Sequence, residues 1–155
     1  MTVGTQLPFD RLIKSVEEWG VSEGYTDIIF QVGKGSYKPK IGQTFDFISE
    51  SKMNFYFDEA QLVIGHAGMG TILNCLTKGR LLVVMPRLFK YGEHRNDHQL
   101  ATFNKIKPTQ GIYLSANESG LHEKINSALN NVNKIIQISE YADQGLINYI
   151  SSKVL

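Results

Sequence analysis

The hydrophobic and polar positions of the chain follow two patterns: short apolar runs, and apolar residues repeated every three or four positions. The apolar runs predict buried strands at residues 1–3, 27–32, 61–64, 81–85 and 111–114. The three-to-four spacing predicts helices at residues 9–19, 70–78, 96–107, 119–131 and 134–153. Gly20, Gly79 and Pro108 stand where three of these helices are expected to end.

One region fits two assignments. Residues 44–48 and residues 53–57 both have strand propensity. The second stretch stands too close to the strand at residues 61–64, because a parallel crossover needs roughly a dozen residues or more. A parallel sheet therefore requires a strand at residues 44–48, followed by a crossover helix at residues 51–60 that Ser51 would cap.

The alternation of strands and helices predicts an α/β fold, with a Rossmann-like parallel sheet and helices on both faces. Such sheets bind ligands beyond the carboxyl ends of their strands. The functional site is therefore expected in the loops that follow the strands, at residues 4–8, 33–39, 65–70 and 86–99.

Composition narrows the class of protein. The 155 residues suffice for one domain with a sizeable core, and 42% of them are hydrophobic and 20% charged, as in soluble globular proteins. A net charge of +1 argues against a nucleic-acid-binding surface or a polybasic membrane patch. The single cysteine, Cys75, excludes a disulfide framework and fits a reducing compartment. No apolar run approaches the roughly 20 residues of a membrane span, and no signal peptide is visible.

The best candidate for chemistry is the glycine-rich loop at residues 65–71 (GHAGMGT). It stands between a strand and a helix, where glycines allow close approach of a ligand and the helix N-terminus attracts phosphate. It is not a P-loop, because no Gly-Lys-Ser/Thr follows, and Leu73 replaces the third glycine of a dinucleotide fingerprint. On the glycines alone, a plain tight turn and a phosphate site both remain open.

Two further loops are expected on the same edge of the sheet. Gly4, Thr5 and Gln6 offer a hydroxyl group and backbone amides to the same anion. Gly33 and Lys34 end the second strand and add a positive charge. Each loop taken alone also fits an ordinary turn, and their common edge is what favours a shared site.

The loop after residues 81–85 is long and polar. His94 and His98 have a spacing that binds zinc on a helix, but the glutamate of H-E-x-x-H is missing and no third ligand is evident, so we predict no metal site. Asn96, His98 and Gln99 fit better as hydrogen-bonding partners of a sugar or ribose. The alternative is an exposed helix start capped by Asn96.

Several other kinds of site find no support. No two aspartates stand two positions apart, so the chain lacks the D-x-D pair with which metal-dependent transferases hold a diphosphate. No Ser-His-Asp elbow or pair of catalytic carboxylates stands out, and Cys75 is expected to be a packed core residue. A diphosphate would have to be held by backbone amides and a helix dipole.

Four stretches together resemble a known family. They are residues 3–6 (VGTQ), 65–72 (GHAGMGTI), 85–87 (MPR) and 96–100 (NDHQL). The set resembles the C-terminal domain of glycosyltransferase family 28, one half of the GT-B architecture, over roughly residues 1–130. It is most similar to the small subunits of two-chain enzymes. These include bacterial exopolysaccharide and capsule β-1,4-glycosyltransferases and the UDP-GlcNAc transferase of the dolichol pathway.

The resemblance implies a UDP-sugar site. The diphosphate would meet the glycine loop and its helix, uracil would pack near the end of the third strand, and polar residues after the fifth strand would contact the sugar. Asn74 occupies a position where a relative has a ribose-binding acid. The implied donor-binding residues are Gly4, Thr5, Gln6, Gly33, Phe47, Ile48, His66, Ala67, Gly68, Gly70, Thr71, Asn74, Pro86, Asn96, His98 and Gln99.

The implied reaction is an inverting hexosyl transfer without metal or cofactor. A base deprotonates the acceptor hydroxyl, and the diphosphate leaves into the amide-rich loop. In complete GT-B enzymes the base and the acceptor site lie on the other domain, so a membrane-anchored second subunit is expected to carry them. His66 stands near enough for a catalytic role; the alternative, which we favour, is that it positions the loop or contacts phosphate.

The resemblance also concerns the tail and the place of action. Residues 134–153 correspond to a final helix that packs across the domain cleft, and we expect them to hold the partner; a last core helix is the alternative. The chain would be cytoplasmic, held at the inner face of the membrane through that partner. Two other functions stay open: a non-catalytic activating subunit, and a dinucleotide-binding module, which the missing G-x-G-x-x-G spacing disfavours.

Overall fold

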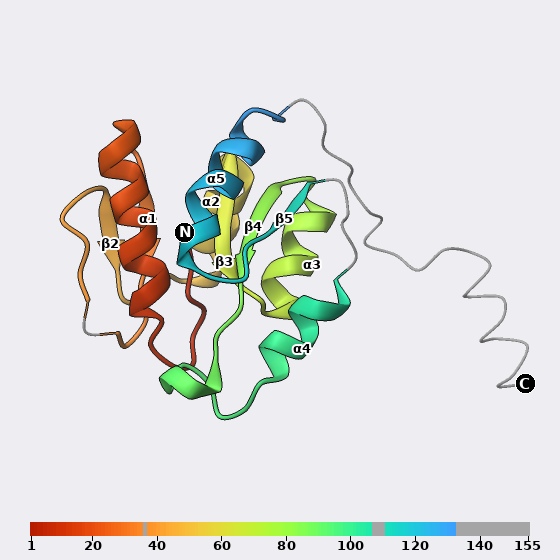
Figure 1. Cartoon of the computed structure of the whole chain (residues 1–155). Coiled ribbons are helices and arrows are strands. Elements are labelled where there is room, and N and C mark those ends of the chain that lie inside the picture. The colour runs from red at the N-terminus through yellow and green to blue at the C-terminus, as the bar shows by residue number, and fades with distance from the viewer. Residues whose placement is uncertain (36, 107–110, 133–155) are drawn as a thin grey trace, which may run out of the picture.

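The computed structural model describes residues 1–35, 37–106 and 111–132. These residues form a layered α/β fold, as predicted (Figure 1). The strands are β1 (Ile29–Gln31), β2 (Gln43–Phe45), β3 (Leu62–His66), β4 (Leu81–Met85) and β5 (Ile112–Leu114). All strand pairs are parallel, β2 with β1 on one side and β3, β4 and β5 in that order on the other.

The segment at residues 1–3 joins these two groups of strands into one sheet. Thr2 bridges to Gln31 of β1 and to Gly65 of β3, both in parallel. The backbone nitrogen of Thr2 donates to the Ile64 carbonyl at 2.9 Å, and that of Val3 donates to the Gln31 carbonyl at 3.1 Å. The predicted first strand is thus a single bridging residue with flanking hydrogen bonds, and the chain that follows it leaves from the middle of the sheet.

Five α-helices and two short 3₁₀ turns are found in the described part of the chain. The helices are α1 (Asp10–Glu23), α2 (Glu50–Glu59), α3 (Met69–Thr77), α4 (His98–Lys105) and α5 (Leu121–Leu129), and the 3₁₀ turns are η1 (Phe89–Tyr91) and η2 (Glu118–Gly120). The helix predicted at residues 134–153 lies outside the described residues.

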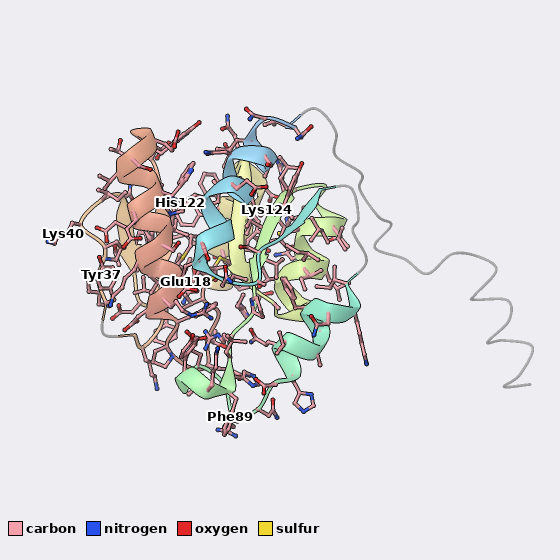
Figure 2. All side chains as sticks on the ribbon, in the orientation of Figure 1. Tyr37, Lys40, Phe89, Glu118, His122 and Lys124 are labelled. Atoms are coloured by element: carbon pink, nitrogen blue, oxygen red, sulfur yellow. The ribbon has the colours of Figure 1, made fainter. Side chains whose placement is uncertain are left out.

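The helices divide between the two faces of the sheet. Apolar residues of α1 and α5 pack on one face with Ile64 and Val83, whereas α2 and α3 pack on the other face with Val63 and Leu82. Neighbouring strand residues therefore face opposite layers, as strand geometry requires. His122, which Figure 2 shows on α5, ties α5 to α1 because its Nε2 lies 2.9 Å from the Ser15 carbonyl oxygen.

The prediction that α1 ends at Gly20 is wrong. The helix continues to Glu23 and ends at Gly24, whose φ of 74° is left-handed. Gly20 is buried, and a Cβ atom there would lie 2.7 Å from the Ile41 side chain and 2.8 Å from Ile28. Gly20 is therefore a site of close packing, and the sequence offers two glycines of which only one is the cap.

The ambiguous region follows the parallel-sheet assignment. The strand β2 forms within residues 44–48, extended by Gln43, and the crossover helix α2 begins at Glu50 after Ser49, not after Ser51 as predicted. Phe57 is the buried residue of α2. Residues 53–57 form a helix despite their strand propensity, because a parallel pair of strands needs a long crossover at this point.

Candidate functional site

A pocket of about 210 Å³ is formed by loops at the carboxyl-end edge of the sheet and by the start of α3. Of the predicted site residues it is lined by Gly4, Thr5, Phe47, Ile48, Gly70, Thr71 and Asn74. Thr2, Gln31, Met53 and Phe57 complete the lining. The structure therefore brings together residues from two predicted loops, from the end of a predicted strand and from the start of a predicted helix, which lie far apart in the sequence.

The remaining predicted residues lie outside this lining: Gln6, Gly33, His66, Ala67, Gly68, Pro86, Asn96, His98 and Gln99. His66, Ala67 and Gly68 stand directly before the lining residues of α3. Pro86, Asn96, His98 and Gln99 belong to the loop after β4 and the start of α4, which Figure 1 shows at the end of the sheet where β3 and β4 terminate. The alternative of a helix capped by Asn96 is wrong, because α4 begins at His98 with Asp97 as its N-cap residue and has no side-chain cap hydrogen bond. Asn96 stands one residue earlier, and its Oδ1 accepts from the His98 nitrogen at 3.1 Å.

A larger hollow of about 600 Å³ lies between α2 and the sheet. Of the predicted site residues only Ile48 lines it, and most of its exposed lining is apolar. The two linings share five residues: Thr2, Gln31, Ile48, Met53 and Phe57. The candidate site is placed in the smaller pocket, because two loops converge there. They are the glycine loop (residues 65–71) and the loop at residues 4–8, called the Gly4 loop from here on.

The start of α3 offers unpaired backbone donors. Gly68 is the N-cap residue, and the Ile72 nitrogen is the first of the helix to donate, to the Gly68 carbonyl at 3.1 Å. Within the described chain, the backbone nitrogens of Met69, Gly70 and Thr71 make no hydrogen bond. Unpaired donors at a helix N-terminus carry positive potential and suit an anionic group.

Gln31 holds the second loop of the pocket. Its side chain is buried, and its Nε2 donates to the carbonyl oxygens of Gly4 and Asp46, each at 3.0 Å. Its Oε1 accepts from the Thr2 hydroxyl at 2.6 Å and from the Gly4 nitrogen at 3.1 Å. Gln31 is not among the residues predicted from the sequence. The available signal was a lone amide in the apolar run of residues 27–32.

Arg87 holds the same loop from the other side. The side chain is 1% exposed and donates to the backbone carbonyls of Val3, Leu7, Pro8 and Glu93. Burial lowers the pKa of Arg87 to about 10, so the guanidinium stays charged at neutral pH. Arg87 lies in the stretch at residues 85–87 that resembles the family, but no role for it was predicted from the sequence. Backbone carbonyls, rather than carboxylates, thus surround a buried cation.

Arg11 and Glu93 fix the loop after β4 to α1. The Glu93 carboxylate accepts two hydrogen bonds from Arg11, each at 2.8 Å, and a third from the Leu88 nitrogen at 2.9 Å. Arg11 also bonds Glu118 at 2.9 Å and the Pro86 carbonyl at 3.1 Å. Figure 2 labels Glu118 close to α1. Pro86 and Glu93 are therefore held by this network.

His66 ends β3 and fills the space between two glycines. A Cβ atom at Gly4 would lie 2.7 Å from the imidazole Cε1, and one at Gly68 would lie 2.2 Å from Nε2. The ring therefore sets the spacing of the Gly4 loop and the glycine loop. Burial, with the nearby positive charges of Arg87 and His94, lowers the pKa of His66 to about 4. A base with so low a pKa is poorly matched to neutral pH, which favours the positioning role over the catalytic one.

The lowered pKa of His66 predicts a loss of stability in mild acid. The unfolded chain takes up a proton on this residue near pH 6.5 and the folded chain only near pH 4. The unfolding free energy therefore falls as the pH drops through this window, by about 3 kcal/mol in full, and this residue adds no pH dependence above it. Urea denaturation at a series of pH values measures the effect. A His66→Gln variant with the same pH slope as the wild type would contradict this origin.

Cys75 is the packed core residue that the sequence predicts. It lies on α3 with no exposed surface, and burial raises the pKa of its thiol to about 12. A thiol of that kind is protonated at neutral pH and is neither a nucleophile nor a metal ligand.

The glycosyltransferase family 28 C-terminal domain matches residues 1–146 of this chain. The chain belongs to this family. The resemblance noted from four short stretches is thereby confirmed, and the glycine loop and the Gly4 loop lie within the matched range. Membership establishes a glycosyltransferase domain; the donor and acceptor need separate evidence.

Two curated relatives share sequence with this chain. It is 36% identical to the mouse UDP-N-acetylglucosamine transferase subunit ALG13 over 95 residues, and 34% identical to the human protein of that name over 110 residues. The alignments cover 55% and 64% of this chain. They span only 8% and 9% of those relatives' own lengths. The likeness therefore concerns one domain of much longer proteins.

A solved structure has the same fold. The crystal structure titled as the glycotransferase of kitacinnamycin matches 97% of this chain and 36% of its own, with a TM-score of 0.54 and 12% sequence identity. At that identity the likeness shows the fold alone. It confirms the predicted Rossmann-like α/β fold. No helix in the described part of the chain is long and apolar enough to cross a membrane.

Proposed function

We propose that this chain is the UDP-sugar-binding subunit of a two-chain inverting glycosyltransferase. The observation that carries the proposal is the pocket in which unpaired backbone donors of α3, the Gly4 loop and the Phe47 ring converge. The α3 donors would receive the diphosphate. The half-exposed Phe47 ring would stack on uracil, and the Asn74 amide would hydrogen-bond ribose.

The pocket supports a mechanism without metal or cofactor. In the proposed reaction the acceptor hydroxyl attacks the anomeric carbon of a hexose, and UDP leaves. Backbone donors and the dipole of α3 stabilise the charge that develops on the diphosphate. His66 spaces the two loops, and His98 and Gln99, on the loop beyond the pocket, are proposed to contact the sugar. The general base belongs to the partner.

The partner is proposed to be a membrane-anchored second subunit that carries the acceptor site. The curated relatives are described as subunits of a transferase, which supports a second chain. A lipid-linked acceptor, in polysaccharide or glycolipid synthesis, would place this chain at the inner face of the membrane through that partner. Residues 134–153, outside the described part, are the proposed contact.

A second candidate is a non-catalytic subunit that activates or stabilises its partner and binds no donor. Asn74, at a position where a relative has an acid, is the feature that favours it. UDP binding separates the two, because only the donor-binding subunit needs an intact pocket.

Calorimetric titration with UDP, on this chain alone and mixed with the second subunit, tests the proposal. We expect binding that Phe47→Ala weakens about ten-fold, because stacking on a base is worth about 1–3 kcal/mol. Phe89→Ala is the matched control: its ring is 58% exposed against 50% for Phe47, and Figure 2 shows it in η1, outside the pocket lining.

Two outcomes, one in the titrations and one in a transfer assay, would count against the proposal. Undetectable UDP binding in both samples would contradict the donor site and favour the activating subunit. Sugar transfer to a lipid-linked acceptor, assayed on the same samples, should require the second subunit. Full turnover by this chain alone would contradict the division of the active site.

A further inference from the structure

The side-chain amide of Gln31 is buried in an apolar strand, and all of its hydrogen-bonding positions are occupied. It ends β1, is 2% exposed, and stands between Phe30 and Val32, which have no exposed surface. Burying an amide costs free energy unless its hydrogen bonds are made. The two donor hydrogens of Nε2 reach the Gly4 and Asp46 carbonyls, and Oε1 accepts two hydrogen bonds. With this capacity filled, Gln31 has no group left for a ligand.

The hydrogen bond to Gly4 sets the direction of the next peptide. The bond between Gly4 and Thr5 is trans, so its carbonyl and its N–H point in opposite directions. Because the Gly4 carbonyl is bound to Gln31, the Thr5 N–H points away from Gln31. Thr5 lines the pocket, and in the described chain its backbone nitrogen makes no hydrogen bond.

The two carbonyl oxygens that Gln31 binds differ in whether a second donor also bonds to them. The Asp46 carbonyl also accepts from the Gly33 nitrogen at 2.9 Å. The Gly4 carbonyl has no second donor among the described residues. Loss of the Gln31 amide would therefore leave the Gly4 carbonyl, next to Thr5, without a hydrogen bond. The Asp46 carbonyl, next to Phe47, would keep its hydrogen bond from the Gly33 nitrogen.

We propose that Gln31 is a positioning residue of the donor pocket, which turns the Thr5 backbone N–H toward the diphosphate of the bound nucleotide. Gln31 also lines the pocket, but its polar atoms are all hydrogen-bonded within the protein, so it acts on the diphosphate through the Gly4 peptide. The inference rests on the proposed function, since it assumes that the pocket binds a uridine diphosphate. It adds a donor from the residues after Gly4 to those of α3.

The test compares UDP with uridine on the Gln31→Met variant, in the complex of both subunits. Methionine keeps the length and the charge state of glutamine and removes its donors. We expect UDP affinity to fall about ten-fold, the effect of losing one hydrogen bond to a charged group, while uridine affinity changes less than about two-fold. Gln43→Met, at an exposed residue of β2, is the matched control and should change neither.

The ratio of the two affinities separates positioning from a general structural role. An equal loss for UDP and uridine, or no loss, would overturn the role of Gln31 and leave the donor site standing. Wild-type protein that binds neither ligand would overturn the proposed function and this inference with it. Should Gln31→Met not fold, amide NMR of the wild type decides: UDP must shift the Thr5 resonance and uridine must not.

Discussion

Replacing Gly4 with alanine is expected to lower the unfolding free energy by about 3 kcal/mol and to remove UDP binding. The φ angle of Gly4 is 73°, where any side chain costs roughly 1–2 kcal/mol. In addition, the new Cβ would lie 2.7 Å from His66 Cε1, and overpacking of this kind adds about 1–3 kcal/mol. The ring and the Gly4 loop must separate, which deforms the pocket. Urea denaturation measures the first effect and calorimetry the second.

Gly24 provides the matched control for this substitution. Its φ is 74°, nearly that of Gly4, but a Cβ atom there would meet nothing within 4 Å. Gly24→Ala should cost only the backbone term, about 1–2 kcal/mol, and leave UDP binding unchanged. In a His66→Ala background the extra cost of Gly4→Ala should shrink. Equal costs at Gly4 and Gly24 in the wild type would contradict the role of the imidazole as a spacer.

Replacing Arg87 with methionine is expected to cost about 3–5 kcal/mol, because several backbone carbonyl oxygens lose their donor at once. The guanidinium is buried and holds carbonyl oxygens of the Gly4 loop, including those of Val3 and Leu7. Without it these carbonyls remain buried and unpaired, each at a penalty of about 1–3 kcal/mol. The loop loses its support, so UDP binding should fall as well. Chemical denaturation and calorimetry measure the two effects.

Arg95→Met is the control for Arg87, because Arg95 lies exposed on the same loop and carries the same charge. It should change stability by less than about 0.5 kcal/mol. Arg87→Lys should give an intermediate loss, since one ammonium group cannot reproduce the planar fork of a guanidinium. Similar stabilities for Arg87→Met and Arg95→Met would show that the carbonyls find other partners.

The strands and helices with strong local signals could be predicted from the sequence. β4 lies at Leu81–Met85, the predicted residues, because five consecutive apolar residues suit a strand buried on both faces. The end of α1 could not be predicted, since Gly20 and Gly24 are both plausible caps. What decides is the Ile41 side chain packed against Gly20, a contact between segments that no local pattern records.

For the candidate site, the sequence predicted several residues that line the pocket but not the residues that hold its loops. The rule that ligands bind beyond the carboxyl ends of parallel strands leads to Thr5 and Gly70, the family resemblance adds Phe47, and all three residues line one pocket. The roles of Gln31 and Arg87 could not be predicted, because their partners are backbone carbonyls in distant segments. The direction of a carbonyl depends on local dihedral angles, and the residue type does not indicate it.

The sequence by itself determined the parallel α/β fold, its family and the loops that meet at one edge, because periodicity and glycine spacing are local properties of the chain. Only the tertiary structure decided how those loops are held. The Gly4 loop is set by a buried amide, a buried guanidinium and the imidazole of His66. Each acts across the sheet through a hydrogen bond or a van der Waals contact, and such contacts exist only once the distant segments are packed together.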